Sequence, residues 1–83
     1  MTKPIREFKP THYMDITSSI SLQIEVVVEN GECFVYASFY DGLNKTFDRV
    51  TKSRARNNAY GNSYFVKANQ RYYLSDFMQK SPF

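Results

Sequence analysis

Apolar and polar residues alternate most regularly between residues 20 and 41, on either side of Asn30-Gly31. Asn-Gly is the strongest short hairpin signal, because both residues accept the positive φ of a type I′ turn. A two-residue turn here predicts an antiparallel hairpin with one apolar face and one mixed face. The predicted apolar pairs are Val28 with Cys33, Val26 with Val35, Ile24 with Ala37 and Leu22 with Phe39, and the mixed face pairs Val27 with Phe34, Glu25 with Tyr36 and Gln23 with Ser38.

The segment after the hairpin begins with a second turn signal, Asp41-Gly42. Leu43, Phe47 and Val50 have helical spacing, but residues 43–50 also fit a third strand that returns along the sheet. We predict the strand. Residues 51–63 contain no aliphatic side chain larger than Ala, and we predict a loop or a short frayed helix there.

Residues 62–79 allow three interpretations. Asn62 or Ser63 can cap a helix, and Ala68 and Leu74 are good helix formers. Strand alternation also fits, as does a hairpin that turns near residues 68–70. We predict the helix, because a sheet of two or three strands needs another element to cover its apolar face.

The predicted fold is therefore a single α+β domain over residues 1–83. It has a small antiparallel sheet built on the hairpin at about 20–40, a third strand and a C-terminal helix behind the sheet. Residues 1–19 are expected to be irregular, since Pro4 and Pro10 interrupt them. The apolar residues that can still pack there as a lid or a short edge strand are Ile5, Phe8, Tyr13 and Ile16.

The expected compartment is the cytoplasm. A single cysteine excludes an intramolecular disulfide, and the N-terminus lacks the pattern of a signal peptide. No apolar run approaches the roughly 20 residues that cross a bilayer. The best one, Val26–Val28, is flanked by Glu25 and Glu29, so we expect no membrane partner.

Charge is distributed unevenly along the chain, although the net charge is only +3. Residues 1–44 carry three Lys or Arg against six Asp or Glu, a net charge of −3. Residues 45–83 carry eight Lys or Arg against two Asp, a net charge of +6. This polarity favours a positive surface directed at an acidic partner, either nucleic acid or an acidic protein.

Catalytic residue patterns are scarce. His12 is the only histidine, and Cys33 falls at an inward hairpin position, where cysteine behaves as a small apolar residue. The sequence contains no Cys-x-x-Cys pair, Walker-type loop or Rossmann glycine pattern. We therefore expect a non-enzymatic protein without a metal or a cofactor.

A cluster of basic and aromatic residues is the main functional signal, and it centres on TKSRARNNAYGNSYF, Thr51 to Phe65. Arginine binds phosphate in bidentate fashion, and tyrosine rings stack on unpaired bases. Lys67 and Arg71 are four residues apart and would share a face in a helix or in a strand. We predict contact with single-stranded RNA or DNA; an acidic protein surface or a merely solvated face are the alternatives. The predicted contact residues are Arg49, Lys52, Arg54, Arg56, Tyr60, Lys67, Arg71 and Tyr73, with Tyr64 and Tyr72 as further stacking candidates.

A second candidate surface is the mixed face of the hairpin, which is more apolar than a solvent-facing surface requires. Either another part of the chain covers it, or it forms a homodimer or partner interface. Its residues are Val27, Phe34, Tyr36 and Tyr40.

In general character the chain resembles the small accessory proteins of tailed phages. The resemblance rests on the Asn-Gly hairpin, the Arg- and Tyr-rich stretches KSRARNNAYGNSYF and QRYYLSDF, and the lack of a catalytic set. It implies that the protein acts in the host cytoplasm and disarms a host nucleic-acid enzyme, as antitoxins do with toxin ribonucleases. The alternative is an inhibitor or adaptor that binds only an acidic protein surface. The resemblance assigns no role to any single residue.

Overall fold

The computed structural model describes residues 8–80, and it is built almost entirely from β-strands. The one helical element in this range is the short 3-10 turn η1, Leu74–Asp76. The predicted α+β class and C-terminal helix are therefore wrong. The strands are β1 His12–Asp15, β2 Ile20–Glu29, β3 Glu32–Asp41, β4 Thr46–Phe47, β5 Thr51–Arg54, β6 Arg56–Asn57, β7 Ser63–Lys67, β8 Gln70–Tyr73 and β9 Met78–Gln79.

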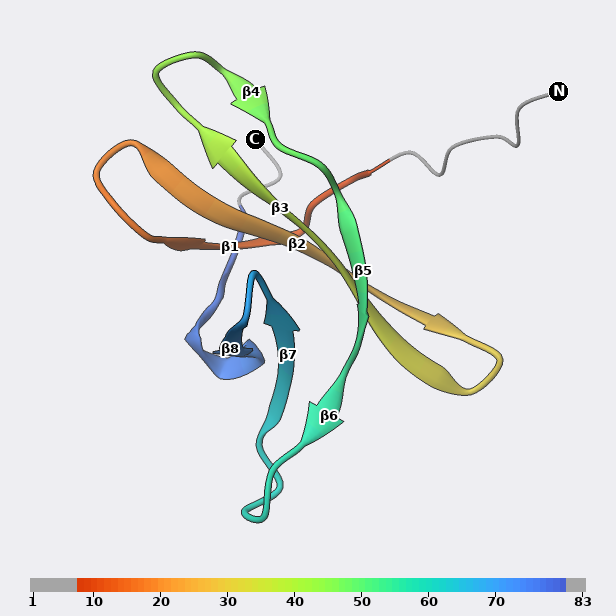
Figure 1. Ribbon diagram of the computed structural model, residues 1–83. Coiled ribbons are helices and arrows are strands. Elements are labelled where there is room, and N and C mark those ends of the chain that lie inside the picture. Colours follow the sequence, from red (N-terminus) through yellow and green to blue (C-terminus); the bar gives the residue numbers. More distant parts are fainter. Residues whose placement is uncertain (1–7, 81–83) are drawn as a thin grey trace, which may run out of the picture.

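The strands form two antiparallel sheets (Figure 1). The main sheet has the order β4-β3-β2-β1-β9, and β5 pairs with β3 on the same side as β4. The small sheet has the order β6-β7-β8. Since Ala55 alone separates β5 from β6, the chain passes from one sheet to the other within a single extended segment. It then returns through β9 to pair with β1.

The hairpin of β2 and β3 forms in the predicted register. Asn30 and Gly31 have φ values of 53° and 79°, as a type I′ turn requires. Val28 pairs with Cys33 and Val26 with Val35, and the remaining predicted pairs follow. Local turn chemistry and strand alternation therefore determine this element.

The predicted third strand, residues 43–50, is replaced by two strands, β4 and β5, which pair with β3 over a longer stretch. β4 pairs with the end of β3, and β5 pairs with its middle, where Tyr36 faces Lys52. Residues 51–57 thus contain β5 and β6, where the prediction of a loop or frayed helix is wrong, whereas residues 58–62 do form a loop. Pairing with β3 and β7 holds β5 and β6 as strands although their residues lack the large aliphatic side chains on which the prediction relied.

A hairpin occupies the place of the predicted helix. β7 and β8 turn at Ala68 and Asn69, whose φ values are 53° and 61°. Phe65 and Tyr72 pair across this hairpin and lie in contact, with ring centroids 5.7 Å apart. The apolar face of the main sheet is therefore covered, as expected, but by a second sheet.

The core lies between the two sheets. The main sheet contributes Leu22, Ile24, Val35 and Ala37, and the small sheet contributes Phe65; all five are buried. Phe77 packs against Phe65 with ring centroids 5.8 Å apart. The end of the β2–β3 hairpin projects beyond the small sheet (Figure 1). Val26 and Val28 are accordingly 40% and 71% exposed, although they share the face of the core residues.

Residues 1–19 are predicted to be irregular, but the described part before β2, residues 8–19, is more regular than that. It contains β1, and the Thr11 amide donates to the Ile24 carbonyl at 2.9 Å. The Lys80 amide in turn donates to the Thr11 carbonyl at 2.8 Å, which extends the pairing of β1 with β9. Phe8 packs edge-on against Phe47 at 5.6 Å, whereas Ile5 lies outside the described residues. This segment therefore packs on the main sheet.

Candidate nucleic-acid interface

The outer face of the small sheet carries the basic and aromatic residues. Side chains alternate along a strand, and Phe65 and Tyr72 point into the core, so their neighbours point to solvent. Tyr64 faces Tyr73 across β7 and β8, and Arg56 of β6 faces Tyr64 from the other side. We call this set, together with the adjoining Arg54, the basic face: Arg54, Arg56, Tyr64, Val66, Arg71 and Tyr73.

A hollow of about 410 Å³ lies on the basic face. Three arginines are among the described residues that line it, and none of those residues is acidic. Within residues 8–80, Arg56 and Arg71 form no ion pair with a carboxylate. Their charge is therefore available to an anionic ligand. Among the residues that the structure describes, the lining is Ser53, Arg54, Arg56, Tyr64, Val66 and Arg71.

Arg71 is held in place by two tyrosines. Its guanidinium carbon lies 4.2 Å from the ring centroid of Tyr64, and the rings of Tyr64 and Tyr73 are 5.6 Å apart. The pKa of Arg71 is raised, mainly by a hydrogen bond to Tyr73 and also by the nearby Tyr64. The hydrogen bond between Arg71 and Tyr73 also lowers the pKa of Tyr73. An arginine stacked on a ring keeps its N–H edge free for phosphate, while less rotamer freedom remains to be lost on binding.

The loop between β6 and β7 is organised by Asn58. Its side-chain oxygen accepts hydrogen bonds from the amides of Tyr60 and Asn62, both at 2.9 Å, and its side chain also bonds Tyr73. Gly61 takes a φ of 83°, which a residue with a Cβ rarely adopts. Tyr60 is 89% exposed. The loop thus presents an exposed aromatic residue beyond the paired ends of β6 and β7.

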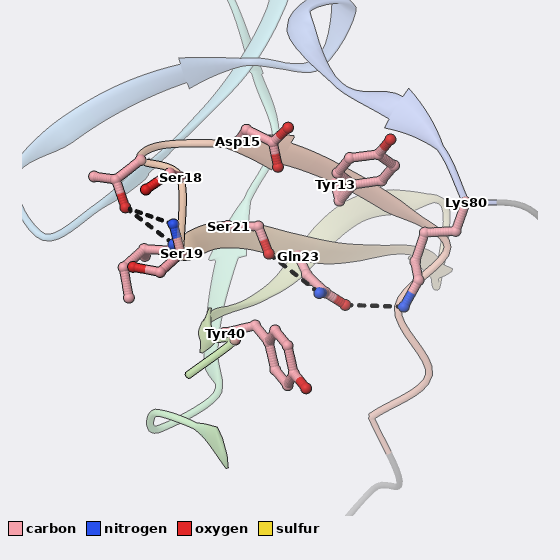
Figure 2. Close-up of a pocket in the computed structure, with 11 residues that line it drawn as sticks. Tyr13, Asp15, Ser18, Ser19, Ser21, Gln23, Tyr40 and Lys80 are labelled. Atoms are coloured by element: carbon pink, nitrogen blue, oxygen red, sulfur yellow. Dashed lines mark hydrogen bonds between the residues drawn. The ribbon is translucent and has the colours of Figure 1, made fainter. Parts of the chain in front are cut away.

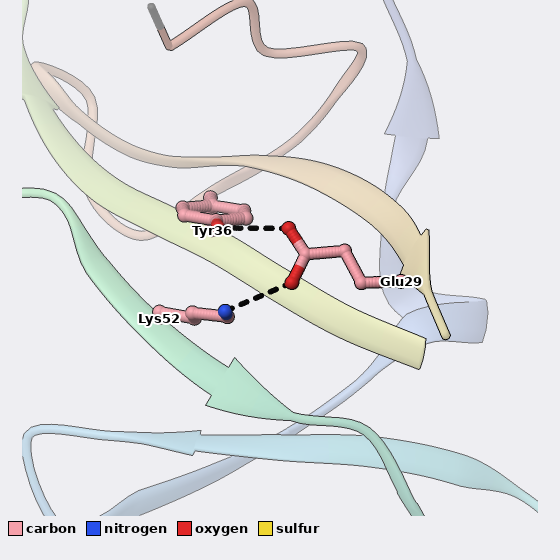
Figure 3. Close-up of polar contacts among 3 residues, drawn as sticks. All are labelled: Glu29, Tyr36 and Lys52. Atoms are coloured by element: carbon pink, nitrogen blue, oxygen red, sulfur yellow. Dashed lines mark hydrogen bonds and ion pairs between the residues drawn. The ribbon is translucent and has the colours of Figure 1, made fainter. Parts of the chain in front are cut away.

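Two other predicted cations pair with acids of the β2–β3 hairpin. Lys52 donates to Glu29 at 2.9 Å, and Tyr36 bonds the other carboxylate oxygen of Glu29 (Figure 3). The hydrogen bond to Glu29 is the main cause of the raised pKa of Lys52. Arg54 forms an ion pair with Glu32. The positive half of the chain is therefore partly neutralised by the negative half, and Lys52 belongs to the hairpin rather than to the basic face.

Lys67 and Arg49 are not part of the basic face. Lys67 is only 6% exposed, and its ammonium group donates to the Arg49 carbonyl and the Thr51 hydroxyl. It lies on the core side of β7, since it alternates with Val66. The prediction that Lys67 shares a face with Arg71 is therefore wrong, because the turn at Ala68 and Asn69 places them on opposite faces. Arg49 lines a separate hollow beside Lys67.

The second predicted surface is half-buried. The Lys52 ammonium lies 4.3 Å from the ring centroid of Phe34 and 5.7 Å from that of Tyr36. The ring of Tyr40 packs against Phe47 at 4.8 Å. Other parts of this chain thus cover much of the surface made by Val27, Phe34, Tyr36 and Tyr40.

Asn58 is a functional candidate that the sequence did not indicate, and Tyr64 is one that the sequence did not distinguish from the other tyrosines. Tyr64 was one stacking candidate among several, and the structure separates it from Tyr72, which packs in the core. The signal that could have identified Tyr64 is its alternation with Phe65, once a strand is assumed. Asn58 carries no such signal, because its role depends on the closed loop geometry.

Comparisons of the chain with protein-family models, curated proteins and solved structures found no match. Within residues 8–80, no three or more His, Cys, Asp or Glu side chains are grouped as a metal site would need. None of the helical structure in that range is long and apolar enough to cross a lipid bilayer.

Proposed function

We propose that this protein is a non-enzymatic binding protein that contacts single-stranded RNA or DNA through its basic face. The observation that carries the proposal is the hollow on the small sheet, where Arg56 and Arg71 pair with no carboxylate of residues 8–80 and Tyr64 and Tyr73 lie beside them. Strands that display aromatic and basic side chains on one face suit unpaired nucleotides.

Each component has a defined task in this proposal. Arg56 and Arg71 contact phosphate oxygens, because a guanidinium donates two parallel N–H bonds. Tyr60 is the stacking platform for a base, since it is almost fully exposed. Arg54 adds positive potential, reduced by its ion pair with Glu32.

Duplex nucleic acid fits this surface less well. A tyrosine can stack only on a base that is unpaired, and a paired base does not offer its face. The basic face also lies on a short sheet, and the described chain offers no helix to enter a major groove. We therefore expect single strands to bind more tightly than a duplex of the same sequence.

Fluorescence anisotropy with a labelled single strand of about 10 nucleotides, a length within the site sizes of single-strand binders, tests the proposal. At about 50 mM salt, where phosphate contacts are strongest, we expect saturable binding of RNA or DNA. Arg56→Ala with Arg71→Ala should weaken it by about tenfold or more. Lys45→Gln, which removes one positive charge from the exposed β3–β4 loop, is the matched control and should have a small effect. No binding of either single strand would refute the proposal.

A second candidate function is inhibition of a protein partner, such as a host nucleic-acid enzyme, through the same arginines. The observation that favours it is the exposed apolar end of the hairpin, Val26 and Val28, which has no task in nucleic-acid binding. Affinity capture from host lysate, with and without nuclease, separates the two functions. A partner retained after nuclease treatment indicates direct protein contact, and a partner lost indicates bridging nucleic acid.

A further inference from the structure

A pocket of about 450 Å³ lies on the main sheet (Figure 2). Most of the strand residues that line it alternate with the core residues, so it faces away from the small sheet. The outer face of the sheet carries Tyr13 of β1, Gln23 of β2 and Tyr40 of β3. Gln23 and Ser38 pair with each other and alternate with the core residues of their strands. Tyr13 pairs with Gln23, and Tyr40 is two residues from Ser38, so both lie on the same face. The β1–β2 turn and Lys80 complete the rim. The pocket shares no residue with the basic face.

The base of the pocket is a fixed amide. Gln23 is only 9% exposed, and its Oε1 accepts a hydrogen bond from Lys80 Nζ at 2.9 Å. An ammonium group can only donate, so this contact fixes the orientation of the amide and directs Nε2 to the hydroxyl of Ser21 at 3.2 Å. Nε2 keeps a second N–H, Oε1 keeps a second lone pair, and the Ser21 hydroxyl hydrogen is left to donate. A buried polar group with unused capacity is suited to bind a polar ligand.

Two aromatic rings flank this amide. Figure 2 shows Tyr13 and Tyr40 on either side of Gln23, with Asp15 next to Tyr13 along β1. Tyr13 pairs with Gln23 and Tyr40 pairs with Ser21, so the two tyrosines are two strand spacings apart across the sheet and are offset by two residues along it. Their backbones are therefore about 12 Å apart. That spacing leaves room for a single small ring between them.

The charge of the pocket excludes a polyanion. Within residues 8–80, its lining contains one carboxylate, Asp15, one ammonium, Lys80, and no arginine. Lys80 already donates to Gln23. The remaining polar groups are hydroxyls, from the two tyrosines and from the residues of the β1–β2 turn and β2 start: Thr17, Ser18, Ser19 and Ser21. Such a set matches a neutral ligand that has many hydroxyl groups and apolar C–H faces.

We propose that this pocket is a binding site for a neutral sugar ring. The ring lies between Tyr13 and Tyr40, its adjacent hydroxyls exchange hydrogen bonds with the Gln23 amide, and Asp15 accepts a further hydroxyl hydrogen. Pockets with a few oriented polar groups between apolar walls are the usual form of small-ligand sites. The proposal does not depend on nucleic-acid binding, since the two surfaces are separate.

Amide chemical shifts in the full chain, titrated with millimolar methyl glycosides of glucose, galactose, mannose and N-acetylglucosamine, test this site. We expect at least one glycoside to shift the amides of Tyr13, Ser21 and Gln23 in a saturable manner. Uridine and adenosine, which carry no charge, are the comparison ligands. Tighter binding of a nucleoside than of every glycoside, no shifts at all, or shifts confined to residues outside the pocket would overturn the proposal.

Two variants localise the effect. Tyr13→Ala removes one wall, and Asp15→Asn removes the exposed carboxylate at constant size; each should weaken glycoside binding by about tenfold. Asp76→Asn is the matched control for charge, because Asp76 is exposed and lies outside the pocket. Asp15→Asn keeps the test valid if Tyr13→Ala does not fold. Equal affinity in Asp15→Asn and Asp76→Asn would count against the assigned contact.

Discussion

The ammonium group of Lys67 donates a hydrogen bond to the hydroxyl of Thr51 at 3.0 Å and thereby joins the small sheet to the main sheet. The same group lies 5.3 Å from the ring centroid of Phe39 and 3.4 Å from the Arg49 carbonyl. Lys67 is thus surrounded by structural partners. Its charge is satisfied inside the molecule and does not face a ligand.

We expect Thr51→Val to lower the free energy of unfolding by about 1–3 kcal/mol, because it leaves a buried ammonium group short of one partner. Thr46→Val, at an exposed position of β4, is the matched control and should change it little. Urea unfolding measures both. A companion single variant, Lys67→Met, removes the buried ammonium group itself. It should lower the free energy of unfolding less than Thr51→Val does, because no buried charge is left short of a partner. If Lys67→Met weakens nucleic-acid binding as much as Arg71→Met, the buried position assigned to Lys67 is wrong.

This pair shows why the candidate site was only partly predictable. The sequence drew attention to Arg56, Arg71 and Tyr73, and the structure places all three on one face of the small sheet, while their contact with a ligand stays a prediction. The sequence could not separate them from Lys67, since spacing of four residues implies a shared face only when no turn intervenes. The ion pairs of Lys52 and Arg54 with Glu29 and Glu32 were equally hidden, because they join segments more than twenty residues apart.

Ala68 is the residue that made the second hairpin hard to predict. It occupies the left-handed region, with φ of 53°, where its Cβ is unfavourable. We expect Ala68→Gly to raise the free energy of unfolding by about 1 kcal/mol, since glycine relieves this strain. Ala59→Gly, outside the positive-φ positions, is the matched control and should not stabilise. Thermal and urea unfolding of both variants would show the difference, and equal destabilisation would contradict the turn geometry.

The contrast between the two hairpins explains what could be predicted about the fold. Asn30-Gly31 predicts its turn, because both residues tolerate positive φ. The ten residues on each side alternate between an apolar and a mixed face, which sets the register of their pairing. Ala68-Asn69 gives no such signal, and the helix-forming residues around it favoured the wrong element. β5 and β6 lack an apolar pattern of their own, so only pairing with β3 and β7 reveals them.

Asp41 should titrate below its ordinary pKa of 3.8. The Asn44 side chain is the main cause, with the Asn44 and Leu43 amides also donating to this carboxylate. A depressed pKa in the folded state contributes stability that is present above the unfolded pKa and is lost as pH falls through the folded value. Asn44→Ala should therefore be less stable than the wild type at neutral pH, and the difference should disappear in acid. Carboxyl NMR titration and unfolding from pH 7 to about pH 2 check this; a pH-independent difference would show that Asn44 acts otherwise.

The salt dependence of binding measures how many phosphates the basic face contacts. For single strands, the slope of log K against log salt is about −0.7 per neutralised phosphate. If Arg56 and Arg71 each contact one phosphate, the variant that lacks both should have a slope shallower by about 1.4. Tyr60→Ala should behave differently, with affinity lowered by about 1–3 kcal/mol and an unchanged slope, because stacking releases no counterions. Anisotropy titrations at several salt concentrations provide both quantities. A slope that is unchanged in the double arginine variant would mean that these arginines reach no phosphate, even if affinity falls.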